Sequence, residues 1–353
     1  MSRFLQLHLL TFFPPANLNR DDTGRPKTAI VGGATRLRLS SQALKRAWRT
    51  SDAFAAALHG HMGQRTQRMG EVVLAHLRDA GMDDAAAIAT ARDIAGVFGK
   101  VKDAKDANPA RTEQLAFISP QERAAALALA DRVRAGEKID AKTAGLLRTS
   151  DTAADIALFG RMLADSPSYN REAAAQVAHA ITTHKVTVED DYYTAVDDLK
   201  TPAEDAGAGF LGEAAFGSGI FYLYLCIDRA LLVKNLGGDI ALAATALGAL
   251  AEAAATTAPN GKQNSFAAHG RAGYILAERG DRQPRTLAGA FAKPVTGDDL
   301  MTGSIQALTK FRANIDTAYG DAAEASAEMN LGVSGTLAEI VAFFRDDASC
   351  LAS

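Results

Sequence analysis

Basic residues are concentrated in one short stretch of this sequence. Between residues 20 and 49 there are eight Lys or Arg and two Asp, a net charge of +6, whereas the whole chain of 353 residues has a formal charge of −3. The basic residues are Arg20, Arg25, Lys27, Arg36, Arg38, Lys45, Arg46 and Arg49. A concentrated positive face on an otherwise acidic protein suits a polyanion, because neutralised phosphates release counterions and dominate nucleic-acid affinity. A charge run alone is more often a solvated helix face.

Polar residues beside these charges favour phosphate binding. Ser40, Ser41 and Gln42 lie where a helix is predicted to begin, with Ser40 or Ser41 as its N-cap. Hydroxyls, amides and backbone N–H groups at a helix N-terminus also bind phosphate. Spacing of i, i+3, i+4 and i+7 puts four polar or basic residues on one side of this helix: Gln42, Lys45, Arg46 and Arg49.

Two adjacent tyrosines, Tyr192 and Tyr193, lie in an acidic segment and are followed by Thr194. Adjacent aromatic residues in an extended segment cannot both face one core, so we expect one ring to be exposed. Exposed aromatic rings stack on bases, or wedge between them, in single-stranded nucleic acid. The alternative is an aromatic residue that packs on a neighbouring subunit or hairpin strand.

A second candidate segment is PNGKQNSF at residues 259–266, which combines turn residues with Lys262, Gln263 and Asn264. Two interpretations remain open for it. It is either the tip of an ordinary loop or a loop that follows a nucleic-acid backbone through its amide and ammonium groups.

Residues suited to catalysis are few. His8, His179 and His184 flank predicted strands, and Asp21 with Asp22 has the oxygen ligands for a divalent ion near bound RNA. No HxxxH, GxSxG, P-loop or GxGxxG pattern accompanies them. We therefore expect no catalytic residues and no metal site. The alternative that stays open is a metal-dependent endoribonuclease that uses Asp21 or Asp22.

Composition excludes several classes of protein. With 48% hydrophobic residues and two cysteines, the chain is neither disordered nor collagenous nor held together by disulfides. Cys226 and Cys350 lie far apart, without a CxxC pair, so we expect no zinc site and a reducing, cytoplasmic setting. The N-terminal segment lacks the features of a signal peptide. The most apolar stretch, 239–257, is interrupted by Asp239 and Glu252, which makes it a buried helix rather than a membrane span.

The predicted elements place these residues on an α+β core. Leucines alternate with polar residues at 5–9, the pattern of a half-buried strand. At 34–40 Arg36 and Arg38 alternate with leucines, which predicts a strand with one charged face. The helix SQALKRAWRTSDAFAAAL follows, with Trp48 on its apolar side. After residue 181 two extended arms around an irregular connection indicate a projecting hairpin.

A helical block interrupts the strands. Residues 55–180 are Ala-rich, and Ser119, Pro120 and Glu122 predict an N-cap, an N1 proline and a capping box for a helix at 119–135. Further strands and helices are expected at 220–227, 229–235, 239–257, 272–277, 304–319 and 335–345. Strands at both ends of the chain with helices between them make an α+β fold into which the helical block is inserted.

Ordered blocks along nearly the whole chain resemble one family, the CasC backbone subunit of the type I-E CRISPR Cascade surveillance complex. They are LNRDD (18–22), AIVGG (29–33), RLRLSSQALKRA (36–47), DIALFGRM (155–162), AHAITTHKV (178–186), YYTAVDDL (192–199), GFLGEAAFGSGIFYLY (209–224), NLGG (235–238) and GKQNSFAA (261–268). Long blocks in a fixed order are far more specific than one short motif. Residues 55–150 and the C-terminal tail match only loosely.

The resemblance implies an α+β fold shaped like a hand: a modified RRM-like (ferredoxin-like) palm, an inserted helical fingers subdomain and a β-hairpin thumb. The corresponding segments are 1–54 and 220–353 for the palm, 55–180 for the fingers, and 181–219 for the thumb and its base.

The resemblance also implies a non-catalytic role in CRISPR antiviral defence. Several copies of such a subunit stack in a helical filament along the spacer of the guide RNA (crRNA), and each thumb kinks the RNA so that short segments can pair with target DNA. The expected partners are crRNA, the target DNA strand, further copies of the chain, and the CasA, CasB, CasD and CasE subunits. No cofactor is expected besides the bound guide RNA.

Individual RNA contacts follow from the matching positions. The resemblance places Arg20 and Lys27 at the RNA backbone, Met162 against bases, and Tyr192, Tyr193 and Thr194 at the thumb, where the family often has Trp-Phe-Thr. Together with the basic stretch, it predicts RNA binding by Arg20, Lys27, Arg38, Ser40, Ser41, Gln42, Lys45, Arg46, Arg49, Met162, Tyr192, Tyr193, Thr194, Gln263 and Asn264. Candidates for target DNA are the lysines of the helical block: Lys100, Lys102, Lys105, Lys138 and Lys142.

Overall fold

The structure, a computed structural model, describes residues 3–138, 140–141, 144–195, 210–321 and 323–345. Residues 196–209 of the predicted thumb segment, Lys142 and Cys350 lie outside the described residues. The chain forms two compact units. Unit 1 comprises Met1–Phe54, Val177–Cys226 and Leu250–Phe344, and unit 2 comprises Ala55–Gln176, Ile227–Ala249 and Arg345–Ser353.

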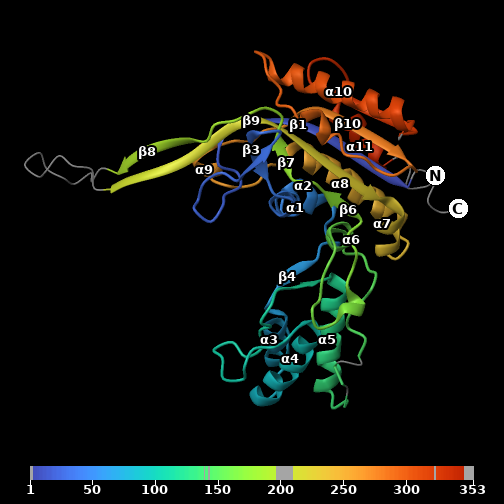
Figure 1. Ribbon diagram of the computed structural model, residues 1–353. Helices are drawn as coiled ribbons and strands as arrows, with labels where there is room; N and C mark the ends of the chain where they lie inside the picture. The colour runs from blue at the N-terminus through green and yellow to red at the C-terminus, as the bar shows by residue number, and fades with distance from the viewer. Residues whose placement is uncertain (1–2, 139, 142–143, 196–209, 322, 346–353) are drawn as a thin grey trace, which may run out of the picture. The chain divides into compact units, whose positions relative to one another are not determined.

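Among the described residues a nine-stranded sheet, most of which lies in unit 1, has the path β11-β10-β1-β9-β7-β3-β2, and β6 and β8 also pair with β9. Its strands are β1 Phe4–Ala16, β2 Thr28–Val31, β3 Ala34–Leu39, β6 Ala175–Val177, β7 Ala180–Thr182, β8 Glu189–Ala195, β9 Phe210–Asp228, β10 Ala272–Gly280 and β11 Ala325–Asn330. The neighbours along this path whose register is defined are antiparallel. The long β9 and the shorter β8 form a hairpin that projects from the rest of the sheet (Figure 1).

Helices cover both faces of this sheet. The helices that contribute to unit 1 are α1 Ser41–Arg49, the C-terminal part of α8 Ile240–Thr256, α9 Gln263–Phe266, η2 Ala288–Phe291, α10 Leu300–Tyr319 and α11 Leu337–Arg345. On one face α10 and η2 pack on apolar residues of β1, β9 and β10, with Leu10, Tyr274 and Leu308 fully buried. On the other face α1 and α8 supply Leu44 and Ala254. The predicted α+β class is therefore confirmed.

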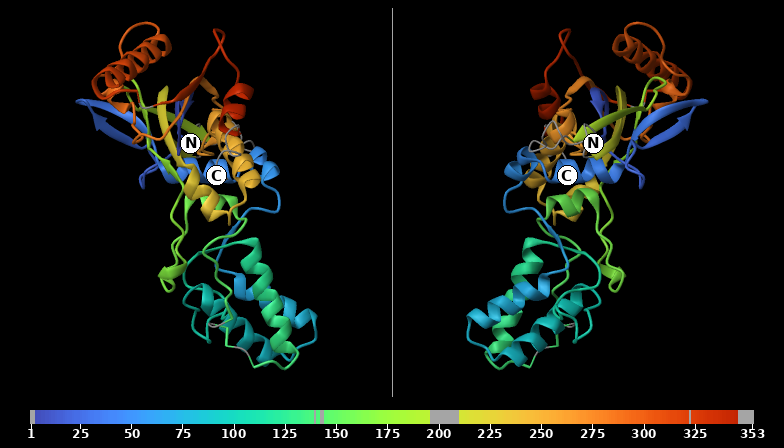
Figure 2. Two further views of the ribbon diagram at one scale, coloured as in Figure 1. Left: turned by 90° about the vertical axis from the view of Figure 1, so that its right-hand side faces the viewer. Right: turned by 90° about the vertical axis from the view of Figure 1, so that its left-hand side faces the viewer.

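Unit 2 is mainly helical. Its elements include β4 Gln64–Thr66, α3 Met69–Asp79, α4 Asp84–Phe98, β5 Ala116–Ile118, α5 Pro120–Arg134, α6 Ala154–Phe159, η1 Pro167–Tyr169 and α7 Arg229–Asn235, and α2 Asp52–Ala57 spans the boundary with unit 1. Helices α3, α4 and α5 pack on one another around Val73, Ala91 and Leu129 (Figure 2). The predicted capping box of α5 is confirmed, since Ser119 and Glu122 exchange side-chain and backbone hydrogen bonds.

Unit 2 also takes in residues 227–249, which the sequence analysis groups with the C-terminal palm segment. The physical reason is local. The buried Asn235, which ends α7, donates side-chain hydrogen bonds to the carbonyl oxygens of Ala157 at 3.1 Å and Glu172 at 2.8 Å. Among the helices of the described residues, none has both the length and the hydrophobicity needed to cross a bilayer.

Most expected elements are confirmed, but the burial of the strands differs from the prediction. The segment 5–9 was expected to be half-buried, yet β1 is buried on both faces there, including Gln6 and His8. Likewise Arg36, placed on a charged face of β3, is fully buried and donates to the carbonyl oxygens of Thr182 at 2.8 Å and Phe291 at 2.9 Å. These polar side chains tolerate burial because they have partners within the fold.

The polar face of β1 is covered by a charged network beneath α10. Glu278 of β10 accepts hydrogen bonds from Arg285 at 2.7 Å and Arg312 at 2.7 Å, and His8 lies 3.3 Å away. Arg285 also binds Asp316 of α10 at 3.0 Å. Burial alone would raise the pKa of Glu278, but its hydrogen bonds with His8 and Arg285 outweigh this and hold the pKa at about 2. The network therefore fixes α10 to the sheet.

We predict that Glu278→Gln destabilises unit 1 by about 3 to 5 kcal/mol at pH 7, because it leaves two arginines without their buried counter-charge. Since the folded-state pKa lies below the ordinary value of 4.5, the carboxylate stabilises the fold above pH 4.5, and this stabilisation is lost as the pH falls towards 2. The difference from wild type should shrink over that range. The measurement is urea unfolding followed by fluorescence of Trp48, the one tryptophan, which is fully buried in unit 1.

The matched control is Glu189→Gln, on the exposed strand β8 of the same unit, which should leave the free energy of unfolding nearly unchanged. A Glu278→Gln protein as stable as wild type at pH 7, or a difference that does not change with pH, would contradict this account of the network.

Candidate nucleic-acid interface

The segment between β1 and β2 is a tight loop held by its own hydrogen bonds. The backbone N–H of Lys27 donates to the carbonyl of Asn19 at 2.8 Å, and that of Asp21 donates to the carbonyl of Arg25 at 2.9 Å. The Asp21 carboxylate accepts from the hydroxyl of Thr23 and from the backbone N–H groups of Thr23 and Arg25. The hydroxyl bond is the main reason that the pKa of Asp21 is lowered. Loop 19–27 is therefore preorganised.

Asn17 ties this loop to the hairpin. Its side chain is 1% exposed, and its amide nitrogen donates to the carbonyl of Gly24 at 2.9 Å and to that of Ala215, in β9, at 2.8 Å. The backbone of Asn17 also meets the loop at 259–266, because a Cβ atom at Gly261 would lie 2.5 Å from the carbonyl oxygen of Asn17 and 2.2 Å from that of Leu18. Three separate segments thus meet at Asn17 and Leu18.

Asn19 ties the same loop to the start of α1. Its side-chain oxygen accepts from the backbone N–H of Ser40 at 2.8 Å. Ser40 is the N-cap, as predicted, and its hydroxyl accepts from the backbone N–H of Ala43. The Ser40 side chain is itself buried, whereas Ser41 is half-buried and Gln42 is exposed. Loop 19–27 and the N-terminus of α1 are therefore held side by side.

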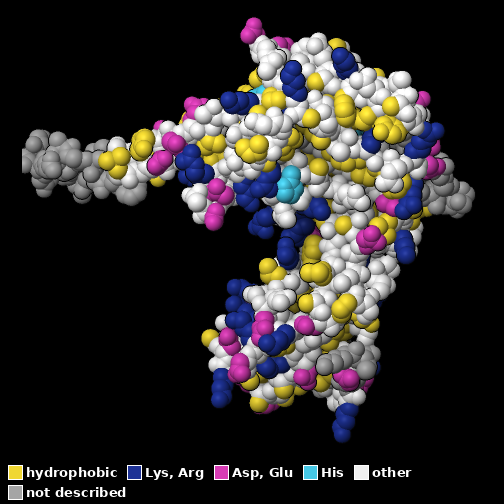
Figure 3. Space-filling model, in the orientation of Figure 1, with side chains coloured by type: hydrophobic (Ala, Val, Ile, Leu, Met, Phe, Trp, Pro, Cys, Tyr) yellow, Lys and Arg dark blue, Asp and Glu magenta, His cyan; other side chains and the backbone are white. Residues whose placement is uncertain are grey.

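The outer side of α1 is basic. Arg46 is exposed, Lys45 and Arg49 are half-buried, and no acidic residue occurs in the first turn. Burial lowers the pKa of Lys45. On the inner side Trp48 is fully buried, together with Leu44 and Ala47. Figure 3 shows Lys and Arg side chains gathered over the part of unit 1 formed by β2, β3 and α1.

The buried Arg36 changes the count of charges available to a ligand. Seven basic residues and two Asp remain accessible between 20 and 49, a net charge of +5 rather than +6. Of these, Arg25 binds Asp190 of β8 at 2.7 Å and lies 3.9 Å from Glu213 of β9. The carboxylate of Asp190, in the acidic hairpin, therefore has a counter-charge within unit 1. The base of the hairpin is thus linked to loop 19–27 a second time.

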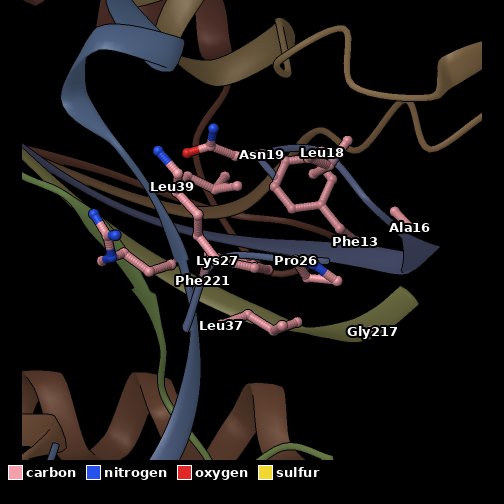
Figure 4. Close-up of a pocket in the computed structure, with 11 residues that line it drawn as sticks. Phe13, Ala16, Leu18, Asn19, Pro26, Lys27, Leu37, Leu39, Gly217 and Phe221 are labelled. Atoms are coloured by element: carbon pink, nitrogen blue, oxygen red, sulfur yellow. The ribbon is translucent and has the colours of Figure 1, made fainter. Parts of the chain in front are cut away.

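A small apolar hollow lies between these segments, with Lys27 and Asn19 at its rim (Figure 4), and Arg38 also lines it. Phe13, Leu18, Leu37, Leu39, Gly217 and Phe221 contribute to its walls. Arg38 donates to the Nδ1 atom of His179 at 2.9 Å. The hollow gives the basic rim a rigid apolar support.

Both tyrosines of the hairpin are exposed, Tyr192 at 69% and Tyr193 at 47%. They lie opposite Glu213 and Gly212, and the Tyr193 ring occupies the space that a Cβ atom at Gly212 would need. Thr194 and every other residue of β8 are exposed as well. The hairpin therefore presents aromatic rings on a ribbon with no core of its own.

The loop at 259–266 contains α9. Gln263 donates its amide to the carbonyls of Pro259 and Ala268, which closes the loop, while Asn264 is exposed. Lys262 has a positive φ of 50°, a left-handed conformation that is strained for a residue other than glycine. Through Gly261 this loop lies against the residues that begin loop 19–27.

Met162 belongs to unit 2 and is 81% exposed. It follows Arg161, whose buried guanidinium binds Glu122 at 2.6 Å. The lysines considered for target DNA are in the same unit: Lys100 pairs with Glu113 at 2.8 Å and Lys102 with Asp106 at 3.4 Å, while Lys105 and Lys138 are exposed. No group of three or more side chains suited to a metal ion occurs among the described residues.

Within unit 1 the structure thus gathers the predicted residues of loop 19–27, α1 and the α9 loop around Asn17 and Asn19, and links the hairpin to them. The sequence analysis did not predict the contacts of four residues that make these links, Asn17, Asn19, Arg25 and His179, although it named Arg25 among the basic residues and His179 among the histidines. Asn19 lies in the LNRDD block and His179 in the AHAITTHKV block. Their place in blocks that carry the family resemblance could have marked them as candidates. Asn17 and Arg25 act through contacts with residues more than 160 positions away.

A family of proteins and two solved structures match nearly the whole chain. The family described as "CT1975-like protein" matches residues 5–341. A solved chain from a "CRISPR RNA-guided surveillance complex, pre-nicking" is 31% identical with a TM-score of 0.84, and the alignment covers 99% of this chain and 100% of that one. A second, from a "CRISPR RNA-guided surveillance complex", is 26% identical with a TM-score of 0.74 and coverages of 98% and 99%. A search of curated proteins gave no match.

The links through Asn17 generate a prediction. Asn17→Ala leaves two carbonyl oxygens without their donor, so we expect unit 1 to lose about 1 to 3 kcal/mol of unfolding free energy and loop 19–27 to lose hydrogen-exchange protection. Exchange followed by mass spectrometry should show this at the backbone N–H groups of Asp21, Arg25 and Lys27. The exposed Asn264, replaced by Ala, serves as the control and should change neither quantity. Unchanged protection in Asn17→Ala would show that this residue does not hold the loop.

Proposed function

The chain belongs to the CT1975-like family, and from this premise we propose that it is a non-catalytic backbone subunit of a CRISPR RNA-guided surveillance complex, which binds guide RNA along its spacer. The observation that carries the proposal is the convergence of basic and amide side chains from three separate segments of unit 1 around Asn17 and Asn19. The two solved chains similar to it over nearly their full length come from assemblies of this kind.

The chemistry of this surface favours the RNA backbone over base edges. Arg20, Lys27, Arg38, Lys45, Arg46 and Arg49 are cations suited to phosphates, and Ser40, Ser41 and Gln42 form the start of α1, where N–H groups and the positive end of the helix dipole also attract phosphate. Gln263 and Asn264 add amides from the neighbouring loop. Contacts with the backbone fix the position of the RNA on the protein but do not depend on the base sequence. This suits a guide RNA whose spacer sequence varies, because base pairing between guide and target supplies the sequence specificity.

The hairpin acts on the bases in this proposal. Tyr192, Tyr193 and Thr194 are exposed on a ribbon whose base is fixed by Asn17 and Arg25. An aromatic ring inserted between two bases costs a few kcal/mol of stacking, which new stacking on the ring offsets. The hairpin would thereby kink the guide at intervals and leave the segments between kinks free to pair. The exposed Met162 of unit 2 packs against bases in this account.

The proposal also assigns the parts of a hand-like architecture to the two units. The sheet of unit 1 with its covering helices is a modified RRM-like palm, the β8–β9 hairpin is the thumb, and the helices of unit 2 are the fingers. Successive copies stack along the guide, and lysines of the fingers face target DNA. The further partners are the other Cascade subunits, CasA, CasB, CasD and CasE, in a cytoplasmic assembly.

The endoribonuclease alternative is not favoured by the geometry of Asp21 and Asp22. Asp21 uses one carboxylate oxygen for three hydrogen bonds within its own loop, so its role there is to fix the turn. Among the described residues Asp22 belongs to no group of three or more His, Cys, Asp or Glu side chains that could hold a metal ion.

The proposal predicts that reversing two charges on α1, Lys45→Glu with Arg49→Glu, abolishes retention of guide RNA at moderate salt. For single-stranded RNA each phosphate contact contributes about 0.7 to the steepness of the plot of log K against log salt concentration. Removal of two contacts should therefore make this slope about 1.4 shallower. The measurement is the amount of RNA that copurifies with the chain, together with anisotropy titrations at several salt concentrations.

The control reverses two arginines of unit 2 instead, Arg132→Glu with Arg134→Glu in the last turn of α5, which makes the same change in net charge. It should retain the RNA. Retention by the α1 variant equal to that of wild type would rule out α1 as the phosphate-binding helix.

A further inference from the structure

His179 contacts Arg38 of the proposed RNA surface, although neither the charge pattern nor the matching positions assigned it a role there. It directly precedes β7, whose first residue, Ala180, pairs with Leu39 of β3. The antiparallel register therefore brings His179 beside Ser40, the N-cap of α1. Its side chain is exposed.

The ring of His179 is bound to Arg38. The Nη1 atom of Arg38 lies 2.9 Å from Nδ1 of His179. A guanidinium has donors and no acceptor, so Nδ1 must accept this hydrogen bond through its lone pair. The ring is then neutral, and its single proton lies on Nε2. Arg38 is additionally held by a hydrogen bond from Nε to the carbonyl of Thr28 at 3.4 Å.

The electrostatic surroundings of His179 are cationic. Its pKa is lowered, first by partial burial and then by the charges of Arg38 from β3 and of Lys27 at the start of β2. The start of α1 beside it adds the positive end of a helix dipole. No carboxylate contributes to the shift. An arriving phosphate would remove this repulsion and favour the protonated ring.

We propose that His179 is a further RNA-binding residue, which donates from Nε2 to a backbone phosphate of the guide and takes up one proton at Nδ1 as the phosphate binds. Protonation of Nδ1 replaces its lone pair with an N–H, so the hydrogen bond from Arg38 breaks. The Arg38 guanidinium is then released to a phosphate as well. His179 therefore binds a phosphate itself and, in its neutral form, also keeps Arg38 hydrogen-bonded and away from the phosphates. This inference rests on the proposed function.

The direction of the pH effect follows from proton linkage. The RNA-bound state holds one more proton per chain than the free state, so the affinity for RNA rises as the pH falls from 8 to 6. One such group changes the affinity by about tenfold per pH unit at most. We expect a gain of about three- to tenfold between pH 8 and pH 6.

The test measures binding of a labelled single-stranded RNA of spacer length to the full chain by fluorescence anisotropy, at constant ionic strength and at pH 6, 7 and 8. Wild type should show the gain in affinity. His179→Gln accepts a hydrogen bond from Arg38 but cannot be protonated, so its affinity should stay flat between pH 8 and pH 6. His59→Gln, an exposed histidine of unit 2, is the matched control and should keep the wild-type profile.

Calorimetry in two buffers of different ionisation enthalpy gives the number of protons directly. Wild type should take up about a quarter to a half of a proton per chain near pH 7, which is what a three- to tenfold gain over two pH units requires, and His179→Gln correspondingly less. Equal pH profiles and equal proton uptake in wild type and His179→Gln would overturn the inference while leaving RNA binding intact. Absence of RNA binding by wild type at every pH and at low salt would instead overturn the proposed function, and this inference with it.

Discussion

The candidate interface depends on one physical constraint: buried polar groups need partners within the fold. Asn17 has almost no exposed surface, and its amide supplies donors to carbonyls of two segments that are nearly 200 residues apart in the chain. Asn19 accepts a hydrogen bond from the N–H of Ser40 through its side-chain oxygen. Because leaving such groups unpaired costs about 1 to 3 kcal/mol each, loop 19–27, the hairpin base and the start of α1 have essentially one arrangement. A surface that grips a phosphate chain needs that rigidity.

The charged residues form two groups: one stabilises the fold, and the other is accessible to a ligand. Arg36, Glu278 and Arg285 are buried or nearly so, are paired with carbonyls or counter-charges, and hold the sheet and α10 together. Arg20, Arg46 and their neighbours on loop 19–27 and α1 keep their charge where a ligand can reach it. Only the second group attracts a polyanion, and exposed charges of this kind contribute little to stability. The buried arginines that stabilise the sheet and α10 are therefore different residues from the exposed cations that can bind RNA.

Local sequence patterns predicted the elements well. The Ser40 and Ser119 caps, the apolar side of α1 around Trp48 and the strand at 220–227 are all present, because each depends on residues a few positions apart. Features that depend on distant contacts were missed. Alternation made β1 look half-buried, since no local pattern reveals the network that covers its polar face. In β11 the sequence ASAEMN has small and charged residues with weak strand preference, and its pairing with β10 decides its conformation. The hydrogen bond of Asn17 to Ala215 and the ion pair of Arg25 with Asp190 were not predicted either, because they too join residues that are far apart in the sequence.

The central claim is that this chain holds guide RNA through its backbone, whatever the spacer sequence. The most direct measurement is the ratio of absorbance at 260 and 280 nm, with the size on a gel-filtration column, of the chain coexpressed with its partner subunits and with either of two CRISPR transcripts of unrelated spacer sequence, or with none. The account predicts a large RNA-containing species of the same size and RNA content with both transcripts, and none without. A small RNA-free protein under all three conditions, or retention of only one spacer, would contradict it.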